Sequence, residues 1–256
     1  MAESTTASSS TTTDADSSTS SRSNVHTALE TMFGLQSKVA IVTGASRGLG
    51  KACAFALAQA GAHVVCVSRK IASVEQTADE IRSAGFSASA LAIDCGDEEA
   101  VVAGVQQIAK TFGTVDVLVN NAGVINHGAA VETSGKDFRA VLDVNLNGCF
   151  YMARECAKYM VKQKQGRIIN MLSALSVLGR ASVHAYTASK HGLLGLTRSL
   201  AAELGPHGIT VNGIGPGHFR TNMTAGIQAS EAFNDMVKER TPVMRWGNPE
   251  DLGGAV

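Results

Sequence analysis

From residue 38 onward, the sequence alternates short apolar runs with segments of helical pattern. The six apolar runs cover residues 38–43, 62–68, 87–93, 115–119, 167–172 and 210–214. Helices are predicted over 49–60, 71–83, 136–146, 148–162 and 184–204, and Val101, Val105, Ile108 and Phe112 recur at helical spacing. Strands that are apolar throughout and separated by helices belong to a parallel sheet covered on both faces. The predicted fold is therefore α/β, a single doubly wound (Rossmann) domain, which binds ligands beyond the carboxyl ends of its strands.

The beginning of the chain differs in composition from the rest. Of residues 1–23, 15 are Ser or Thr and none is Leu, Ile, Val or aromatic. Such a segment cannot bury enough apolar surface to offset the entropy that ordering would cost. We therefore predict a disordered Ser/Thr-rich leader over 1–33 and one folded domain over 34–256.

Charge and cysteine content exclude several functional classes. The 22 basic and 22 acidic residues give a formal net charge of zero, so no basic surface predicts a nucleic-acid partner. No apolar run reaches the roughly 18 residues that a membrane span requires. The five cysteines form no C-x-x-C pair and the seven histidines no H-E-x-x-H pattern. We therefore expect reduced thiols, no metal site and a cytoplasmic protein.

A glycine-rich turn follows the first predicted strand and opens the first predicted helix. Residues 43–50 read TGASRGLG, and three glycines at this spacing form a tight turn and let the backbone approach a pyrophosphate. Free N–H groups at the helix start attract the phosphates. The strand–turn–helix context favours a dinucleotide site. The residues of the turn that we expect at the cofactor are Gly44, Ser46, Arg47, Gly48, Leu49 and Gly50.

The end of the second predicted strand favours NADP over NAD. An NAD site usually has a carboxylate here, which accepts a hydrogen bond from the ribose 2′-OH. This strand instead ends in Ser68 and Arg69, and Arg69 together with Arg47 is placed to meet a 2′-phosphate. Two solvated surface arginines are the alternative interpretation. Asp94, followed by Cys95 at the end of the third strand, is either the acceptor for the adenine amine or a helix N-cap.

Tyr186 and Lys190 are four residues apart in the predicted helix 184–204, so their side chains project from one face. A phenol with a pKa of about 10 is a poor base at neutral pH, and a nearby ammonium stabilises the phenolate. Such a tyrosine can take a proton from an alcohol or give one to a carbonyl oxygen. An ordinary surface pair on a helix is the alternative.

Further motifs accompany this pair. Residues 120–123 read NNAG, Asn145 lies in VNLNG, Ser173 precedes Tyr186 by thirteen residues, and residues 216–217 read PG. Together with the glycine turn, and in this order and spacing, they resemble the short-chain dehydrogenase/reductase family over residues 38–256.

The resemblance implies a reaction and a role for each residue. The reaction is hydride transfer between a nicotinamide and a substrate carbon, which interconverts a secondary alcohol and a ketone. Tyr186 is then the general acid/base, and Lys190 lowers its pKa and binds the nicotinamide ribose. Ser173 hydrogen-bonds the substrate oxygen, and Asn145 positions a water that links Lys190 to solvent. The further implied cofactor contacts are Asn121, Ala122, Gly123, Pro216, Gly217, Phe219 and Thr221.

The resemblance also bears on the end of the chain and on its assembly. Family members continue past a helix that starts at residue 248 and add a last strand at the sheet edge. The implied domain is therefore C-terminally truncated, with that strand missing. A homotetramer or dimer is implied, in which helices 148–162 and 184–204 pair the subunits.

Three stretches narrow the implied substrate. Residues 173–180, 212–217 and 240–249 resemble those of gluconate 5-dehydrogenases, which implies a sugar acid or polyol. The chain departs from those enzymes at residues 124–127 (VINH), where they tend to carry an Arg-Arg pair. A 3-oxoacyl-[acyl carrier protein] reductase and a non-catalytic, cofactor-binding homologue are the alternatives. The candidate substrate residues are Asn126, His127, Arg180, His184, His218 and Arg220.

Overall fold

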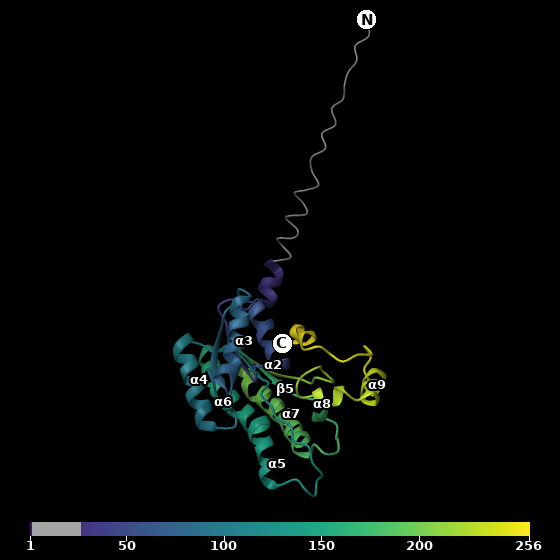
Figure 1. Cartoon of the computed structure of the whole chain (residues 1–256). Helices are drawn as coiled ribbons and strands as arrows, with labels where there is room; N and C mark the ends of the chain where they lie inside the picture. The colour runs from purple at the N-terminus through teal and green to yellow at the C-terminus, as the bar shows by residue number, and fades with distance from the viewer. Residues whose placement is uncertain (2–26) are drawn as a thin grey trace. The chain divides into compact units, whose positions relative to one another are not determined.

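The computed structural model describes Met1 and residues 27–256 in two units, 1–35 and 36–256 (Figure 1). In the first unit, residues 27–33 form a helix, and Thr31 Oγ1 donates a hydrogen bond to the carbonyl oxygen of Thr27. The sequence predicts no regular structure there; Ala28, Leu29, Glu30 and Met32 are good helix formers. The rest of the predicted leader, residues 2–26, lies outside the described residues.

The second unit is built on a parallel sheet, as predicted. The described residues form six strands in the order β3-β2-β1-β4-β5-β6, with every neighbouring pair parallel. Each predicted strand end lies within two residues of the observed one. The order reverses between β1 and β4, which is where a doubly wound sheet binds its ligand. The strands are β1 (Val39–Thr43), β2 (His63–Ser68), β3 (Ala88–Ala92), β4 (Val117–Asn120), β5 (Gly166–Met171) and β6 (Ile209–Ile214).

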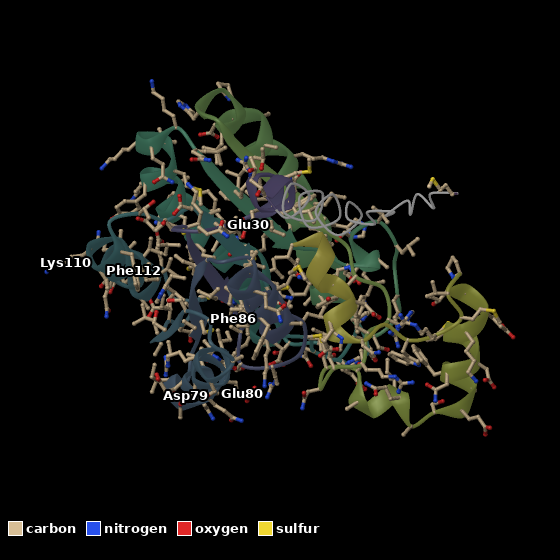
Figure 2. All side chains as sticks on the ribbon, turned by 90° about the horizontal axis from the view of Figure 1, so that it is seen from above. Glu30, Asp79, Glu80, Phe86, Lys110 and Phe112 are labelled. Carbon is tan, nitrogen blue, oxygen red and sulfur yellow. The ribbon has the colours of Figure 1, made fainter. Side chains whose placement is uncertain are left out.

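Helices cover both faces of the sheet. On one face α4 (Glu98–Phe112) packs against α6 (Gly148–Gln163), and α6 against α7 (His184–Leu204); on the other, α2 (Gly48–Gln59) packs against α3 (Ile71–Ser83) (Figure 1). All five residues of β1 are buried because alternate side chains meet the two layers. The polar side chains Asp79 and Glu80 of α3 and Lys110 of α4 lie at the periphery (Figure 2).

The connections differ most from the prediction. The predicted helix 136–146 is α5 (Gly135–Leu142) followed by a π-helical turn, η1 (Asp143–Asn147), which leads directly into α6. A predicted helix after residue 248 is instead a 3₁₀ helix, η4 (Pro249–Ala255), capped by Asn248. Short 3₁₀ helices lie after β5 and α7, and two short helices after β6 have no counterpart in the prediction. These elements are η2 (Ala174–Ser176), η3 (Gly205–His207), α8 (Ala225–Gln228) and α9 (Glu231–Arg240).

Candidate active site

The glycine turn has a backbone that only glycine fits. Gly44 and Gly48 have φ angles of +66° and +55°, in the left-handed region that favours glycine. A Cβ atom on Gly44 would lie 2.8 Å from Asn121 Nδ2. A Cβ atom on Gly50 would overlap both Asn121 and the Gly44 carbonyl. The turn therefore packs closely against the segment after β4.

The amino end of α2 suits an anion. Its N-cap, Arg47, has an extended backbone, and no side chain of the described residues caps the helix. The first turn contains no acidic residue. The N–H groups at this end are thus available to a phosphate, and the exposed Arg47 adds a positive charge. Ser46 and Leu49 lie half-buried in the same turn.

Thr43 joins the glycine turn to the NNAG segment. Its Oγ1 atom accepts hydrogen bonds from the N–H groups of Asn121 and Ala122, both at 2.9 Å. Asn121 Nδ2 in turn donates to the carbonyl oxygen of Thr43 at 2.9 Å. Thr43 is not among the predicted site residues, although a buried hydroxyl directly before the first glycine was a signal for it. Gly123, a predicted cofactor contact, comes directly after Ala122 in the chain.

The ends of β2 and β3 bring the predicted 2′-phosphate and adenine residues together. Arg69 is exposed directly after β2. Burial raises the pKa of the Cys95 thiol to about 12, and the positive charge of Arg69 acts on the same thiol in the opposite direction.

The helix-cap interpretation of Asp94 is wrong, because the N-cap of α4 is Asp97. The Oδ1 atom of Asp97 accepts hydrogen bonds from the N–H groups of Glu99 at 3.0 Å and Ala100 at 3.2 Å. Asp94 is exposed; its side chain accepts a hydrogen bond from the N–H group of Gly96, and its carbonyl oxygen accepts one from the N–H group of Asp97.

Tyr186 meets Ser173 across the β5–α7 connection. Burial raises the pKa of Tyr186 above its usual 10, and a side-chain hydrogen bond with Ser173 acts in the opposite direction. Ser173 also begins η2, where its Oγ atom accepts a hydrogen bond from the Leu175 N–H group at 3.1 Å. The serine hydroxyl is thus held by the backbone beside the phenol.

Lys190 lies behind Tyr186. Its Nζ atom is 5.6 Å from the centroid of the Tyr186 ring and donates a 2.6 Å hydrogen bond to the Met171 carbonyl oxygen. Burial lowers the pKa of this lysine below 10.5. The sequence interpretation gives Lys190 the task of lowering the Tyr186 pKa. In this structure that pKa is raised instead, because burial of the phenol dominates.

Asn145 lies in the π-helical turn and is completely buried. Its Oδ1 atom accepts from the N–H group of Val124 at 2.8 Å, and its Nδ2 atom donates to the Val124 carbonyl oxygen at 2.9 Å. Nδ2 also lies 3.2 Å from Ser189 Oγ, which donates to the Tyr186 carbonyl oxygen. The side chain therefore clamps the segment after NNAG to α7.

The segment after β6 lies between the two halves of the site. A Cβ atom on Gly215 would be 3.8 Å from the Ser173 carbonyl oxygen, and one on Gly48 would be 3.4 Å from Thr221 Cγ2. Pro216 and Gly217 follow Gly215. Phe219 pairs with Gly247 in an isolated parallel bridge. The segment that carries the predicted cofactor contacts after β6 thus extends from Ser173, near Gly215, to the glycine turn, near Thr221.

Two of the predicted substrate residues meet an aromatic cluster that the sequence analysis missed. The Arg180 guanidinium lies 5.6 Å from the Phe233 ring centroid, and the His218 ring lies 5.4 Å from Phe233 and 5.6 Å from Trp246. The only signal for this cluster in the sequence was the presence of Phe233 and Trp246 in a segment to which no helix or strand was assigned. His184 Nε2 is buried without a hydrogen-bond partner among the described residues. Asn126, His127 and Arg220 are exposed.

Three further features concern metal ligands, cysteines and membrane spans in the described part of the chain. No three His, Cys, Asp or Glu side chains of the described residues are grouped as metal ligands. The five cysteines are buried and unpaired. No described helix is long and apolar enough to cross a membrane.

Known proteins resemble the chain over most of its length. The profile described as short chain dehydrogenase matches residues 38–232. Gluconate 5-dehydrogenase of Gluconobacter oxydans is 38% identical over 224 residues, covering 88% of each chain. 2-Dehydro-3-deoxy-D-gluconate 5-dehydrogenase of Escherichia coli is 39% identical over 225 residues, also 88% of each. A crystal structure of a Burkholderia cenocepacia gluconate 5-dehydrogenase in complex with NADP and tartrate has a TM-score of 0.84 at 34% identity, covering 87% of this chain and 88% of that one.

Proposed function

Because the chain belongs to the short chain dehydrogenase family, we propose that it is an NADP-dependent oxidoreductase that interconverts a secondary alcohol and a ketone on a sugar acid. The observation that carries the proposal is the position of Tyr186, whose pKa is raised by burial and lowered by its interaction with the Ser173 side chain, and whose ring centroid lies 5.6 Å from Lys190 Nζ. Relatives named for gluconate and 2-dehydro-3-deoxy-D-gluconate support the substrate class.

Each catalytic side chain has one task in this proposal. The Tyr186 phenolate accepts the proton of the substrate alcohol during oxidation, and the protonated Tyr186 hydroxyl donates it to the carbonyl oxygen during reduction. Ser173 donates a hydrogen bond to the same oxygen and stabilises the negative charge that develops on it. Lys190 favours the phenolate through its positive charge. Asn145 is a positioning residue, because its amide fixes Val124 against α7.

The residues around the glycine turn fit a dinucleotide. The tight turn at Gly44 and Gly48, which has positive φ angles, and the uncapped start of α2 suit a pyrophosphate. When bound, the nicotinamide would supply or accept the hydride. Arg47 and Arg69 are exposed and would hold a 2′-phosphate, and the NADP in the Burkholderia relative supports this choice. Asp94, Cys95, Ser68 and residues 216–221 would line the remainder of the site.

The direct test is oxidation of NADPH with a panel of ketones. We expect turnover with 5-ketogluconate, none with an acetoacetyl thioester, and a loss of about 10²-fold or more in kcat/KM for Tyr186→Phe. Preference for the thioester would favour the acyl-carrier-protein reductase alternative. Absence of turnover with every ketone, while NADPH still binds, would favour the non-catalytic alternative.

Cofactor choice has its own test. Arg69→Asp replaces a phosphate-binding cation with a carboxylate that can accept a ribose hydroxyl, so NADPH should bind at least about tenfold more weakly and NADH more tightly. Fluorescence titration of both nucleotides measures this without turnover. Arg167→Asp, near the amino end of β5 and so at the opposite end of the strands from the site, is the control. An unchanged ratio of the two affinities in Arg69→Asp would contradict the proposed role.

We also propose residues 34–256 as the catalytic domain and 1–33 as a separate leader. The division of the chain into units 1–35 and 36–256 supports this boundary. A reducing compartment such as the cytoplasm would suit the five unpaired cysteines.

A further inference from the structure

We propose that Arg180 recognises the carboxylate of the substrate and that the ring of Phe233 holds it in position. This inference rests on the proposed function, since it takes a sugar acid as the substrate. It adds a residue that selects the acid over a neutral sugar derivative of the same length.

The stacking of Arg180 leaves its hydrogen-bond donors free. Its Cζ atom lies 5.6 Å from the Phe233 ring centroid. A cation–π contact between a guanidinium and an aromatic ring uses none of the guanidinium N–H groups as hydrogen-bond donors. Two of those groups match the two oxygens of a carboxylate. The ring therefore restricts the side chain without occupying the groups that would bind an acid.

No described residue supplies a carboxylate or carbonyl partner to Arg180. Only three of the described arginines have an acidic partner: Arg82 with Asp79, Arg154 with Glu98, and Arg245 with Asp251, each at 2.6–2.8 Å. Arg180 is also exposed. An oriented guanidinium without an internal anion has room for one from solution.

The fold places this cation at the catalytic side of the sheet. Arg180 lies in the β5–α7 connection, between Ser173 and Tyr186. Phe233, under Arg180, also contacts the ring of His218, which follows Gly215 in the segment beside the Ser173 carbonyl oxygen. A substrate whose reacting oxygen binds Ser173 and Tyr186 can therefore extend toward Arg180.

Of the four residues whose side chains meet in the cluster (Arg180, His218, Phe233 and Trp246), Arg180 carries the positive charge. Burial lowers the pKa of His218 below 6.5, and the charge of Arg180 lowers it further. The histidine is therefore neutral at pH 7 and suits sugar hydroxyls. The loop after Gly123 offers no lysine or arginine between residues 124 and 135.

The test compares D-gluconate with D-gluconamide, which has the same length and no charge. Contacts made equally in the ground state and the transition state change KM and leave kcat in place. Arg180→Gln should therefore raise the KM for gluconate by about tenfold or more, keep kcat within about threefold, and abolish the preference for the acid. Arg180→Lys should retain part of the preference, because it keeps the charge and loses the bidentate geometry.

Two further variants separate recognition from folding. Phe233→Leu should raise the KM for gluconate in the same direction, because it removes the ring that positions Arg180. Arg167→Gln changes an exposed arginine near the amino end of β5, at the opposite end of the strands from the site, and should behave as the wild type. Thermal unfolding of each variant, with and without gluconate and NADP, reports folding and binding independently of turnover.

The inference is overturned if Arg180→Gln keeps the wild-type preference for the acid, or if it loses activity equally on acid and amide. A wild type that turns over ketones but no sugar acid would instead contradict the proposed substrate class, and the carboxylate assignment with it. An active wild type with an unchanged Arg180→Gln variant contradicts the assignment alone.

Discussion

The buried amine of Lys190 is held by one strong contact, its 2.6 Å hydrogen bond to the Met171 carbonyl oxygen. Removing an ammonium from water costs free energy that a single hydrogen bond offsets only in part. Burial therefore lowers its pKa, although the nearby Cys149 acts in the opposite direction. A lysine buried in this way lowers the free energy of unfolding. Its presence agrees with a role in the reaction rather than in stabilising the core.

We predict that Lys190→Met lowers kcat by about 10²-fold or more without lowering the free energy of unfolding at pH 7. The folded-state pKa lies below the unfolded value of 10.5, so the unfolded chain binds more protons between these two values. Wild-type stability should thus rise with pH in this window, and that of the variant should not. Urea unfolding at a series of pH values measures both.

Lys136→Met is the matched control, since Lys136 is exposed on α5. It should change neither kcat nor the pH dependence of unfolding. Retained activity in Lys190→Met, or a clear loss of its stability at pH 7, would contradict the interpretation.

At the scale of elements, buried amides connect the strands to the helices that carry the site. Asn120 Nδ2 on β4 donates to the Cys149 carbonyl oxygen of α6 and to Asn170 Oδ1 on β5, both at 3.0 Å. Asn170 Nδ2 donates to Thr197 Oγ1 on α7 at 2.9 Å. Every member is buried. The network therefore fixes α7, with Tyr186 and Lys190, against the sheet.

We predict that Asn170→Ala and Thr197→Ala each lower the free energy of unfolding by about 1–3 kcal/mol, because each leaves a buried polar partner unpaired. The double variant should lose less than the sum of the two, by about 0.5 kcal/mol or more. Denaturant unfolding of the four proteins gives this coupling energy. Additive losses would mean that the hydrogen bond between the two side chains contributes little.

At the scale of the whole molecule, α6 presents an aromatic and cationic surface. Phe150 is 38% exposed, and the Arg154 guanidinium lies 5.7 Å from its ring centroid and 5.9 Å from that of Tyr151. Aromatic residues and arginine are enriched in the centres of protein interfaces. This surface fits the expectation that α6 pairs subunits in a homo-oligomer.

We predict that Phe150→Glu shifts the chain to a smaller assembly, because it removes the ring from the contact and because burying a carboxylate there costs free energy even beside Arg154. Light scattering coupled to size-exclusion chromatography measures the mass. Val131→Glu, at a loop position that is 95% exposed, should leave the mass unchanged. A wild-type chain that is already monomeric would contradict the prediction.

The sequence by itself determined the six strands, the glycine turn and the Tyr186–Lys190 pair. These features depend on local rules, because an apolar run must be buried, a turn with positive φ requires glycine, and residues four apart share one face of a helix. The sequence also indicated Arg180 and His218 as candidate substrate residues. It did not indicate Phe233, whose ring contacts both.

Only the tertiary structure decided the features that arise where distant segments meet. Thr43 binds the NNAG segment, Asn145 clamps Val124, and Phe233 lies under Arg180. The raised pKa of Tyr186 also has this origin. Its direction depends on how completely other elements exclude water from the phenol, and no spacing along one chain encodes that balance of burial against charge.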